Sequence, residues 1–149
     1  MKRWGLLALF LLLTLGGGWI MGSLTDTSGW YQEIAKPSFT PPNWVFPVAW
    51  TTLYVLIAIA GWRVHLAGLA RARALWWLQL VLNFAWTPLF FALHWTGVSL
   101  LVVAAMLVII LSFIAESWRG ERLAAGCFVP YACWVAYAGV LNASIWWMN

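Results

Sequence analysis

Residues 98–118 read VSLLVVAAMLVIILSFIAESW, with no charged side chain before Glu116. As a helix rising about 1.5 Å per residue, this run spans about 30 Å, the thickness of a bilayer's hydrocarbon core. The whole chain of 149 residues is 64% hydrophobic and only 8% charged. So few polar groups cannot cover a water-soluble surface. The sequence therefore predicts an integral membrane protein.

Other apolar runs of similar length lie on both sides of this segment. The expected membrane spans are residues 4–24, 44–66, 74–95, 98–118 and 123–148. They predict an all-α fold, a single domain of residues 1–149 built as an integral membrane bundle of five transmembrane helices. Most connections are short, but residues 25–43 are polar and rich in turn-forming residues. We expect this long loop to fold over one end of the bundle.

The basic residues indicate how the chain is oriented in the membrane. If the spans alternate in direction, seven of the eight lie on the side of the N-terminus and only Lys36 lies opposite; the seven are Lys2, Arg3, Arg63, Arg71, Arg73, Arg119 and Arg122. By the positive-inside rule we expect a cytoplasmic N-terminus and a C-terminus on the far side, in an inner membrane. The net charge of +4 is thus a topology signal and predicts no nucleic-acid partner.

The chain contains fourteen tryptophans, which fall into two groups. Most lie near the expected span ends, where an indole sits at the headgroup level; these are Trp4, Trp30, Trp44, Trp62, Trp76, Trp77, Trp95, Trp118, Trp146 and Trp147. The other four, Trp19, Trp50, Trp86 and Trp134, lie well inside spans. There each indole N–H needs a partner in a nearly dry interior.

Helix geometry places several of these residues at similar depth beneath the long loop. Trp50 lies roughly 9 Å below Trp44, and Asn83 lies roughly 18 Å below Trp95. Trp134 is near the middle of the last span, and Trp86 lies beside Asn83 on the third. An aromatic layer with few polar atoms is typical of small-molecule sites, so we expect a ligand cavity here.

Polar side chains in the third and fifth spans leave two interpretations open. Two stripes have helical spacing, one of Gln79, Asn83 and Thr87 and one of Trp134, Ala138 and Asn142. They indicate either hydrogen bonds between helices or the polar lining of a cavity. Pro88 and Pro130 are equally ambiguous, since a proline kink serves packing or widens a cavity.

The sequence has none of the usual catalytic or metal-binding patterns. His65 and His94 are expected at opposite ends of the bundle, so no metal site is predicted. We find no nucleophile–base pair, phosphate loop or paired carboxylates, and we expect no required cofactor. No charged residue lies near the middle of any span, which disfavours an ion-coupled transporter.

Several blocks of sequence resemble, in order, the TspO/translocator protein family, also called tryptophan-rich sensory proteins. They are Trp30-Tyr31, Lys36-Pro37, residues 41–47 (PPNWVFP), 49–51 (AWT) and 53–54 (LY), residues 82–91 (LNFAWTPLFF), and residues 129–131 (VPY) with Trp134 and 141–142 (LN). The resemblance covers essentially the whole chain.

The resemblance implies a five-helix bundle, often a homodimer, that binds tetrapyrroles such as protoporphyrin IX and drug-like benzodiazepine-site ligands beneath the first loop. Matched by position, the family pocket falls on Tyr31, Phe46, Trp50, Asn83, Trp134 and Ala138. To these we add Trp86 as a candidate from its place beside Asn83. The family also includes members assigned to outer membranes, which keeps that location open.

One part of the chain departs from the animal members of the family. Those members carry a cholesterol-recognition stretch, a tyrosine followed by a basic residue, at the end of the fifth helix. Residues 140–149 here read VLNASIWWMN and have neither. We therefore do not expect steroid binding.

Three functions follow as hypotheses. The first is a receptor or sensor in which Trp50 and Trp134 stack on a bound tetrapyrrole. Lys36 either pairs with a propionate of that ligand or remains a solvated loop residue. The second is enzyme-like, a light- and oxygen-dependent breakdown of porphyrin with Trp50 and Trp134 as the catalytic residues, as the resemblance implies. The third is a small-molecule transporter.

Overall fold

A computed structural model describes residues 2–149, and within that range the secondary structure is helical with no strand. The elements are α1 (Arg3–Ser23), α2 (Trp30–Glu33), α3 (Val45–Leu66), α4 (Ala70–Thr87), η1 (Pro88–Ala92), α5 (Thr96–Ser117) and α6 (Arg122–Met148). Five helices are long and apolar enough to cross a membrane, with α4 and η1 acting as one continuous span. The predicted all-α bundle of five spans is confirmed.

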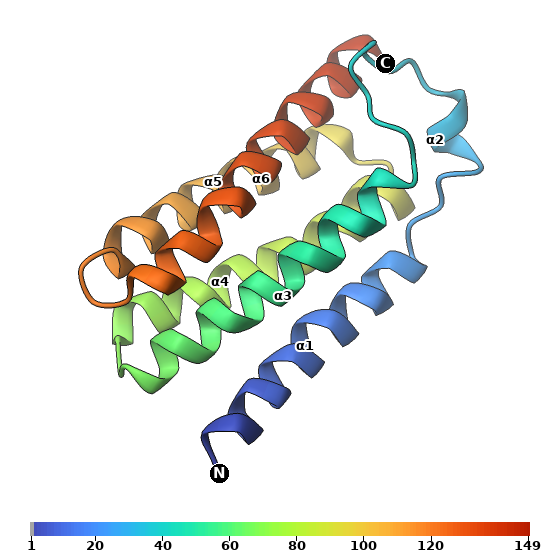
Figure 1. The fold of residues 1–149 in the computed structure, drawn as a ribbon. Coiled ribbons are helices and arrows are strands. Elements are labelled where there is room, and N and C mark those ends of the chain that lie inside the picture. The colour runs from blue at the N-terminus through green and yellow to red at the C-terminus, as the bar shows by residue number, and fades with distance from the viewer. Residues whose placement is uncertain (1) are drawn as a thin grey trace.

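The five long helices lie side by side in an order that differs from their order in the chain. α3 packs between α1 and α6, and α5 packs between α6 and α4, whereas α1 and α4 touch only lightly (Figure 1). The chain termini lie at opposite ends of the bundle. The long loop that carries α2 covers the end that holds the C-terminus, which we call the loop side.

Two helix ends differ from the sequence-based expectation. The expected spans 74–95 and 98–118 left Thr96 and Gly97 as the turn between them. Both residues instead begin α5, and the turn lies at residues 93–95 with His94 at a positive φ of 57°. Pro88 was expected to kink the third span from within, and it begins the π-helical turn η1. A proline lacks the N–H of the α-helical ladder, and a wider turn is one way to accommodate it.

Three tryptophans are placed differently from the prediction. Trp76 and Trp62 were assigned to the membrane interfaces, but both are buried, and their indoles donate to the carbonyls of Ile57 (2.8 Å) and Arg3 (3.0 Å). Trp19 was expected in the interior and is instead 78% exposed on α1. Distance from a span end does not tell which way a side chain points around the helix, and that rotation decides burial here.

The loop between α1 and α3 is ordered by its own polar contacts. Asp26 accepts hydrogen bonds from the Ser28 hydroxyl (2.6 Å) and the backbone N–H groups of Ser28 (2.8 Å) and Gly29 (3.3 Å), which lower the pKa of its carboxyl. The ammonium of Lys36 lies against the carbonyl oxygens of Tyr31 and Ile34 and over the Tyr31 ring. Lys36 is therefore engaged within the loop itself.

Candidate ligand cavity

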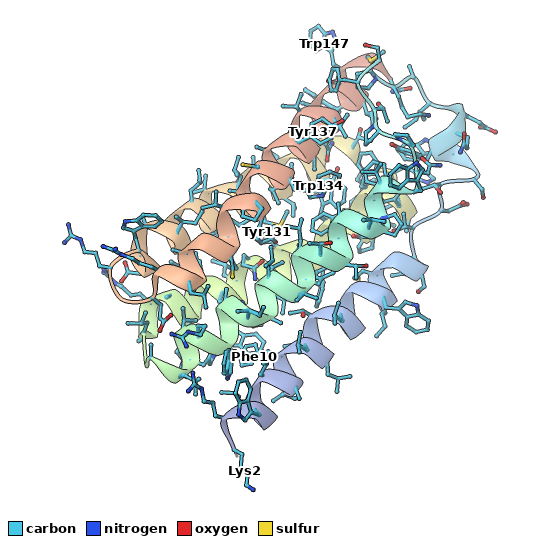
Figure 2. The ribbon with its side chains drawn as sticks, in the orientation of Figure 1. Lys2, Phe10, Tyr131, Trp134, Tyr137 and Trp147 are labelled. Atoms are coloured by element: carbon cyan, nitrogen blue, oxygen red, sulfur yellow. The ribbon has the colours of Figure 1, made fainter. Side chains whose placement is uncertain are left out.

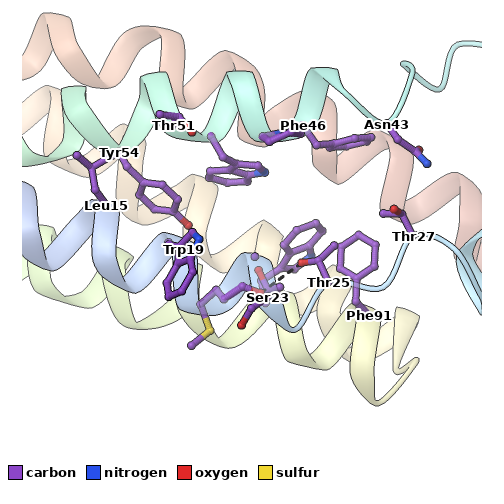
Figure 3. Close-up of a pocket in the computed structure, with 17 residues that line it drawn as sticks. Leu15, Trp19, Ser23, Thr25, Thr27, Asn43, Phe46, Thr51, Tyr54 and Phe91 are labelled. Atoms are coloured by element: carbon purple, nitrogen blue, oxygen red, sulfur yellow. Dashed lines mark hydrogen bonds between the residues drawn. The ribbon is translucent and has the colours of Figure 1, made fainter.

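A cavity of about 700 Å³ lies on the loop side, between α1, α3 and the end of α4 with η1 (Figure 3). Its lining consists of Leu15, Gly18, Trp19, Met21, Gly22 and Ser23 from α1, Thr25, Thr27 and Asn43 from the loop, Phe46, Pro47, Trp50, Thr51 and Tyr54 from α3, and Trp86, Thr87 and Phe91. The volume falls within the roughly 300–1,000 Å³ of small-molecule sites. The lining carries no charged side chain.

The cavity has an aromatic floor and a polar rim. Trp50 is central to the floor: its ring stacks on Tyr54 at 5.6 Å with 29° between planes, and it lies 6.5 Å from Trp86. The rim, nearest the loop, carries the hydroxyls of Ser23, Thr25 and Thr27 and the amide of Asn43. Such a site offers flat apolar surface to most of a ligand and hydrogen-bonding groups to one edge.

Some of the site residues predicted from the sequence line this cavity, and others lie outside its lining. Phe46, Trp50 and Trp86 line it, whereas Tyr31, Asn83, Trp134 and Ala138 do not belong to the lining. Trp134 projects from α6 toward the bundle interior (Figure 2), with its ring perpendicular to that of Trp50 at 6.4 Å.

Tyr31 and Ala138 are both buried outside the lining. Tyr31 lies in α2 with its ring 5.5 Å from that of Phe91, which itself lines the cavity. Burial raises the pKa of the Tyr31 hydroxyl, and the neighbouring Tyr137 adds to this shift. The Tyr31 hydroxyl is therefore a neutral group at physiological pH. Tyr31 supports the loop-side end of the cavity through Phe91.

Asn83 forms part of a hydrogen-bond network between helices. Its amide accepts from the Tyr54 hydroxyl (2.8 Å) and donates to the Tyr131 hydroxyl (2.8 Å), which donates in turn to Gln79 (2.7 Å). All four side chains are buried. Of this stripe, Gln79 and Asn83 form hydrogen bonds that join α3, α4 and α6, whereas Thr87 lines the cavity. Because Tyr54 lines the cavity, the network also fixes part of its wall.

A second network holds Trp86 in place. The Trp86 indole donates to the side-chain oxygen of Asn142 (3.0 Å), which also accepts from the Ser99 hydroxyl (2.9 Å), and the Asn142 amide donates to the carbonyl of Thr96 (2.8 Å). This arrangement supplies the partner that an interior indole was expected to need. The Trp134 indole nitrogen differs: it is buried without a hydrogen-bond partner among the described residues.

The residues that α1 contributes to the cavity were missed by the sequence analysis. Gly18, Trp19, Gly22 and Ser23 all lie in its last two turns. The available signal was the glycine-rich run of residues 16–18 followed by Gly22, since small residues mark places where a helix approaches or leaves a neighbour. The predicted pocket came instead from α3, α4 and α6.

Histidines and other metal ligands are dispersed in the described part of the chain. His65 lies near the end of α3 away from the loop, and His94 lies on the loop side, stacked on Trp30 at 4.1 Å. Within residues 2–149, no three His, Cys, Asp or Glu side chains are grouped to hold a metal ion.

Comparison with known proteins identifies relatives of this chain along most of its length. The model of the TspO/MBR family matches residues 10–148. The chain is 39% identical to protein CrtK of Rhodobacter capsulatus over 86% of this chain and 83% of that protein. It is 36% identical to the tryptophan-rich sensory protein of Cereibacter sphaeroides, over 93% and 88%, and 33% identical to the translocator protein of Bos taurus, over 94% and 88%. A match along nearly the full length places this five-span membrane protein in the TspO/MBR family.

Proposed function

We propose that the protein is a membrane receptor or sensor that binds a tetrapyrrole of the protoporphyrin IX type in the cavity beneath its loop. The observation that carries the proposal is the cavity itself, about 700 Å³ of space with Trp50, Tyr54, Trp86 and Phe91 around it. A flat macrocycle gains more binding free energy from such walls than other shapes do, because aromatic rings stack on its faces and replace its contacts with lipid. A free-base porphyrin needs no axial ligand, so no histidine is required.

The polar rim suits the one polar edge of such a molecule. The propionates of a porphyrin lie on one side of the ring, and the rim groups of Ser23, Thr25, Thr27 and Asn43 lie on one side of the cavity. The first two hydroxyls already donate to carbonyls of α1, so the proposal takes the Thr27 hydroxyl and the Asn43 amide as the donors to a propionate. Lys36 is held by backbone carbonyls of the loop, so the proposal assigns the propionates to the rim and not to an ion pair with Lys36. A drug-like aromatic ligand of similar size should compete for the same walls.

The test is a titration of protoporphyrin IX into the protein in lipid nanodiscs, followed through the porphyrin absorption band. Trp50→Leu removes the central ring of the floor and should weaken binding roughly tenfold, about 1.4 kcal/mol. The matched control is Trp147→Leu, because Trp147 is 84% exposed on α6 and points away from the bundle (Figure 2). Equal weakening in both variants, or no saturable binding to the wild type, would count against the proposal.

A second function is favoured by the arrangement of Trp134. Its ring stands perpendicular to Trp50 at 6.4 Å, and its indole nitrogen has no partner among the described residues. An electron-rich indole beside the ligand's stacking partner fits a light- and oxygen-dependent breakdown of bound porphyrin. Under illumination in air, the porphyrin band should fade faster with the wild type than with Trp134→Phe. Equal fading would leave a binding role alone.

A further inference from the structure

We propose that the cavity fills sideways from the loop-side leaflet of the membrane, through the seam between the outer ends of α1 and α3. Its ligand class is then a planar amphiphile dissolved in lipid, which keeps its polar edge at the rim. This inference rests on the proposed function and adds to it the route of the ligand and its orientation.

The loop is fastened to the bundle on the side away from α1. The Asn149 side chain accepts from the Ala35 N–H (3.0 Å) and donates to the Ala35 carbonyl (3.0 Å), while the Tyr137 hydroxyl donates to the Phe39 carbonyl (2.5 Å). Trp30 stacks on His94 in the turn before α5. These contacts tie the middle of the loop to α6 and to the turn before α5. The loop is thus a fixed roof over the cavity.

Glycines on α1 show where this helix parts from its neighbours. A side chain at Gly18 would meet the Tyr54 ring, and one at Gly17 would meet the Phe84 ring, so α1 is in close contact there. The Thr14 hydroxyl also lies 2.9 Å from the Tyr54 carbonyl. One turn beyond Gly18, a side chain at Gly22 would meet nothing within 4 Å. The helix therefore diverges from α3 over its last turn and leaves open space.

The lining residues on either side of this space are exposed, whereas those of the opposite wall are buried. Trp19, Gly22 and Ser23 of α1 and Pro47 and Thr51 of α3 are exposed. Trp86, Thr87 and Phe91 of the opposite wall, on α4 and η1, are buried, as is Tyr54 deeper on α3. Figure 3 shows the lining residues between these two helices, with Trp19 on α1 and Thr51 on α3.

The opening lies at membrane depth. Thr51 is six residues after the first residue of α3, roughly 9 Å along the helix, and Trp19 is four residues before the end of α1, roughly 6 Å. Both positions face lipid when the helices span a bilayer. A ligand that reaches the cavity by this route is one that partitions into the bilayer first. The hydroxyl-bearing rim at the loop end then receives its polar edge while the apolar ring lies toward Leu15 and Tyr54.

The kinetic test measures protoporphyrin IX exchange between lipid nanodiscs and the protein by stopped flow. Gly22→Leu puts an isobutyl group into the open space, and we expect association and dissociation to slow together, each by roughly tenfold, with the equilibrium constant changed by less than about threefold. The matched control is Gly16→Leu, on the same helix and also with nothing within 4 Å, but outside the cavity lining. Its rates should equal those of the wild type.

The same assay tests whether ligand enters under the loop. Asn149→Ala removes the two hydrogen bonds that hold the Ala35 backbone to α6. Unchanged rates support entry through the seam. Faster association in Asn149→Ala, unchanged rates in Gly22→Leu, or a faster dissociation alone in Gly22→Leu would each overturn it. Faster dissociation alone would mean that the substitution at Gly22 weakens ligand binding and that the ligand does not pass this position.

A second test needs no ligand. In a Cys133→Ala background, which removes the exposed native cysteine, Thr51→Cys should react with a lipid-soluble maleimide and not with a sulfonated one. Reaction with the sulfonated reagent would show a water-filled route under the loop and overturn the inference. If wild type fails to bind protoporphyrin while this labelling pattern holds, the proposed function fails and the sideways opening stands.

Protection from labelling by bound ligand tests whether the seam leads to the cavity that binds the ligand. Thr51 lines the cavity, whereas the adjacent Thr52 is exposed on the same helix outside the lining. Bound protoporphyrin should protect Thr51→Cys from the lipid-soluble maleimide and leave Thr52→Cys fully reactive. Equal protection of both, or of neither at saturating ligand, would overturn the assignment of the seam to this cavity.

Discussion

The Tyr131 hydroxyl is the hub of the polar contacts inside the bundle. It accepts a hydrogen bond from Asn83 and donates one to Gln79, so one atom from α6 satisfies two buried side chains of α4. A buried polar group without a partner is costly, more so where no water or lipid headgroup can replace the lost bond. The network therefore specifies how α6 sits against α4.

Tyr131→Phe leaves the donor of Asn83 and the acceptor of Gln79 unpaired without changing the volume of the ring. We expect a loss of about 1–2 kcal/mol in the free energy of unfolding, measured by thermal or denaturant unfolding in detergent. The comparison is Tyr137→Phe, which removes an exposed hydroxyl bound only to the Phe39 carbonyl and should cost less than half as much. Similar losses in both variants would contradict this account of the network.

At the residue scale, the sequence predicted which polar side chains matter but not their partners. The spacing of Gln79 and Asn83 put both on one face of a helix, and both are buried. Whether that face met a cavity or another helix depended on Tyr131 and Tyr54, two rings on helices far away in the sequence. Helical spacing carries no information about such contacts, so the two interpretations could not be separated.

At the scale of helices, the local contact of Trp76 in α4 with α3 depends on Gly61. The Trp76 ring lies directly over this glycine, and its indole N–H bonds the Ile57 carbonyl one turn earlier on α3. A larger residue at position 61 would displace the indole and stretch that bond. The same helix pair carries Tyr54 and Trp86, so the position of α4 also sets the width of the cavity.

Gly61→Ala should lower the free energy of unfolding by about 1–3 kcal/mol, because the added methyl group overlaps the Trp76 ring. Gly126→Ala, in α6, has open space around it and should raise stability by up to about 1 kcal/mol through helix propensity. Unfolding in detergent measures both. A stabilised Gly61→Ala would mean that the indole moves aside at no cost.

Helix positions were predicted well because hydropathy is a sum over some twenty residues, and membrane insertion responds to that sum. Helix rotation was not. α1 is apolar on every side, so nothing in its sequence tells which way Trp19 points. It was expected in the interior, but it is exposed and lies on the α1 side of the cavity. The α1 wall of the cavity was missed for the same reason. For α3 and α4, composition alone also did not show which helix face points into the bundle. The resemblance to a family supplied that information.

At the scale of the whole molecule, charge separates the two ends. At the end opposite the loop, Arg63 forms a two-point ion pair with Glu121, at 2.7 and 3.0 Å, which joins α3 to the turn before α6. The other basic residues except Lys36 lie at the same end of the helices. Five spans place the two termini on opposite sides of a membrane.

The charge distribution gives a prediction for orientation. Alkaline phosphatase fused after Asn149 should be active, because the positive-inside rule places the N-terminal side in the cytoplasm and the C-terminus outside it. A fluorescent protein that folds only in the cytoplasm should be dark at that position. The reverse pattern would show that the loop and the cavity rim face the cytoplasm.

The seam between α1 and α3 also bears on what a measured affinity means for this protein. Occupancy of a site that opens to lipid depends on the ligand concentration in the membrane, which is the ratio of ligand to lipid. It does not depend directly on the ligand concentration in water. Its half-saturation point, expressed as an aqueous concentration, should shift with the lipid content of the sample and with the partition coefficient of the ligand. Two ligands with equal contacts to Trp50 would then be ranked by their solubility in the membrane.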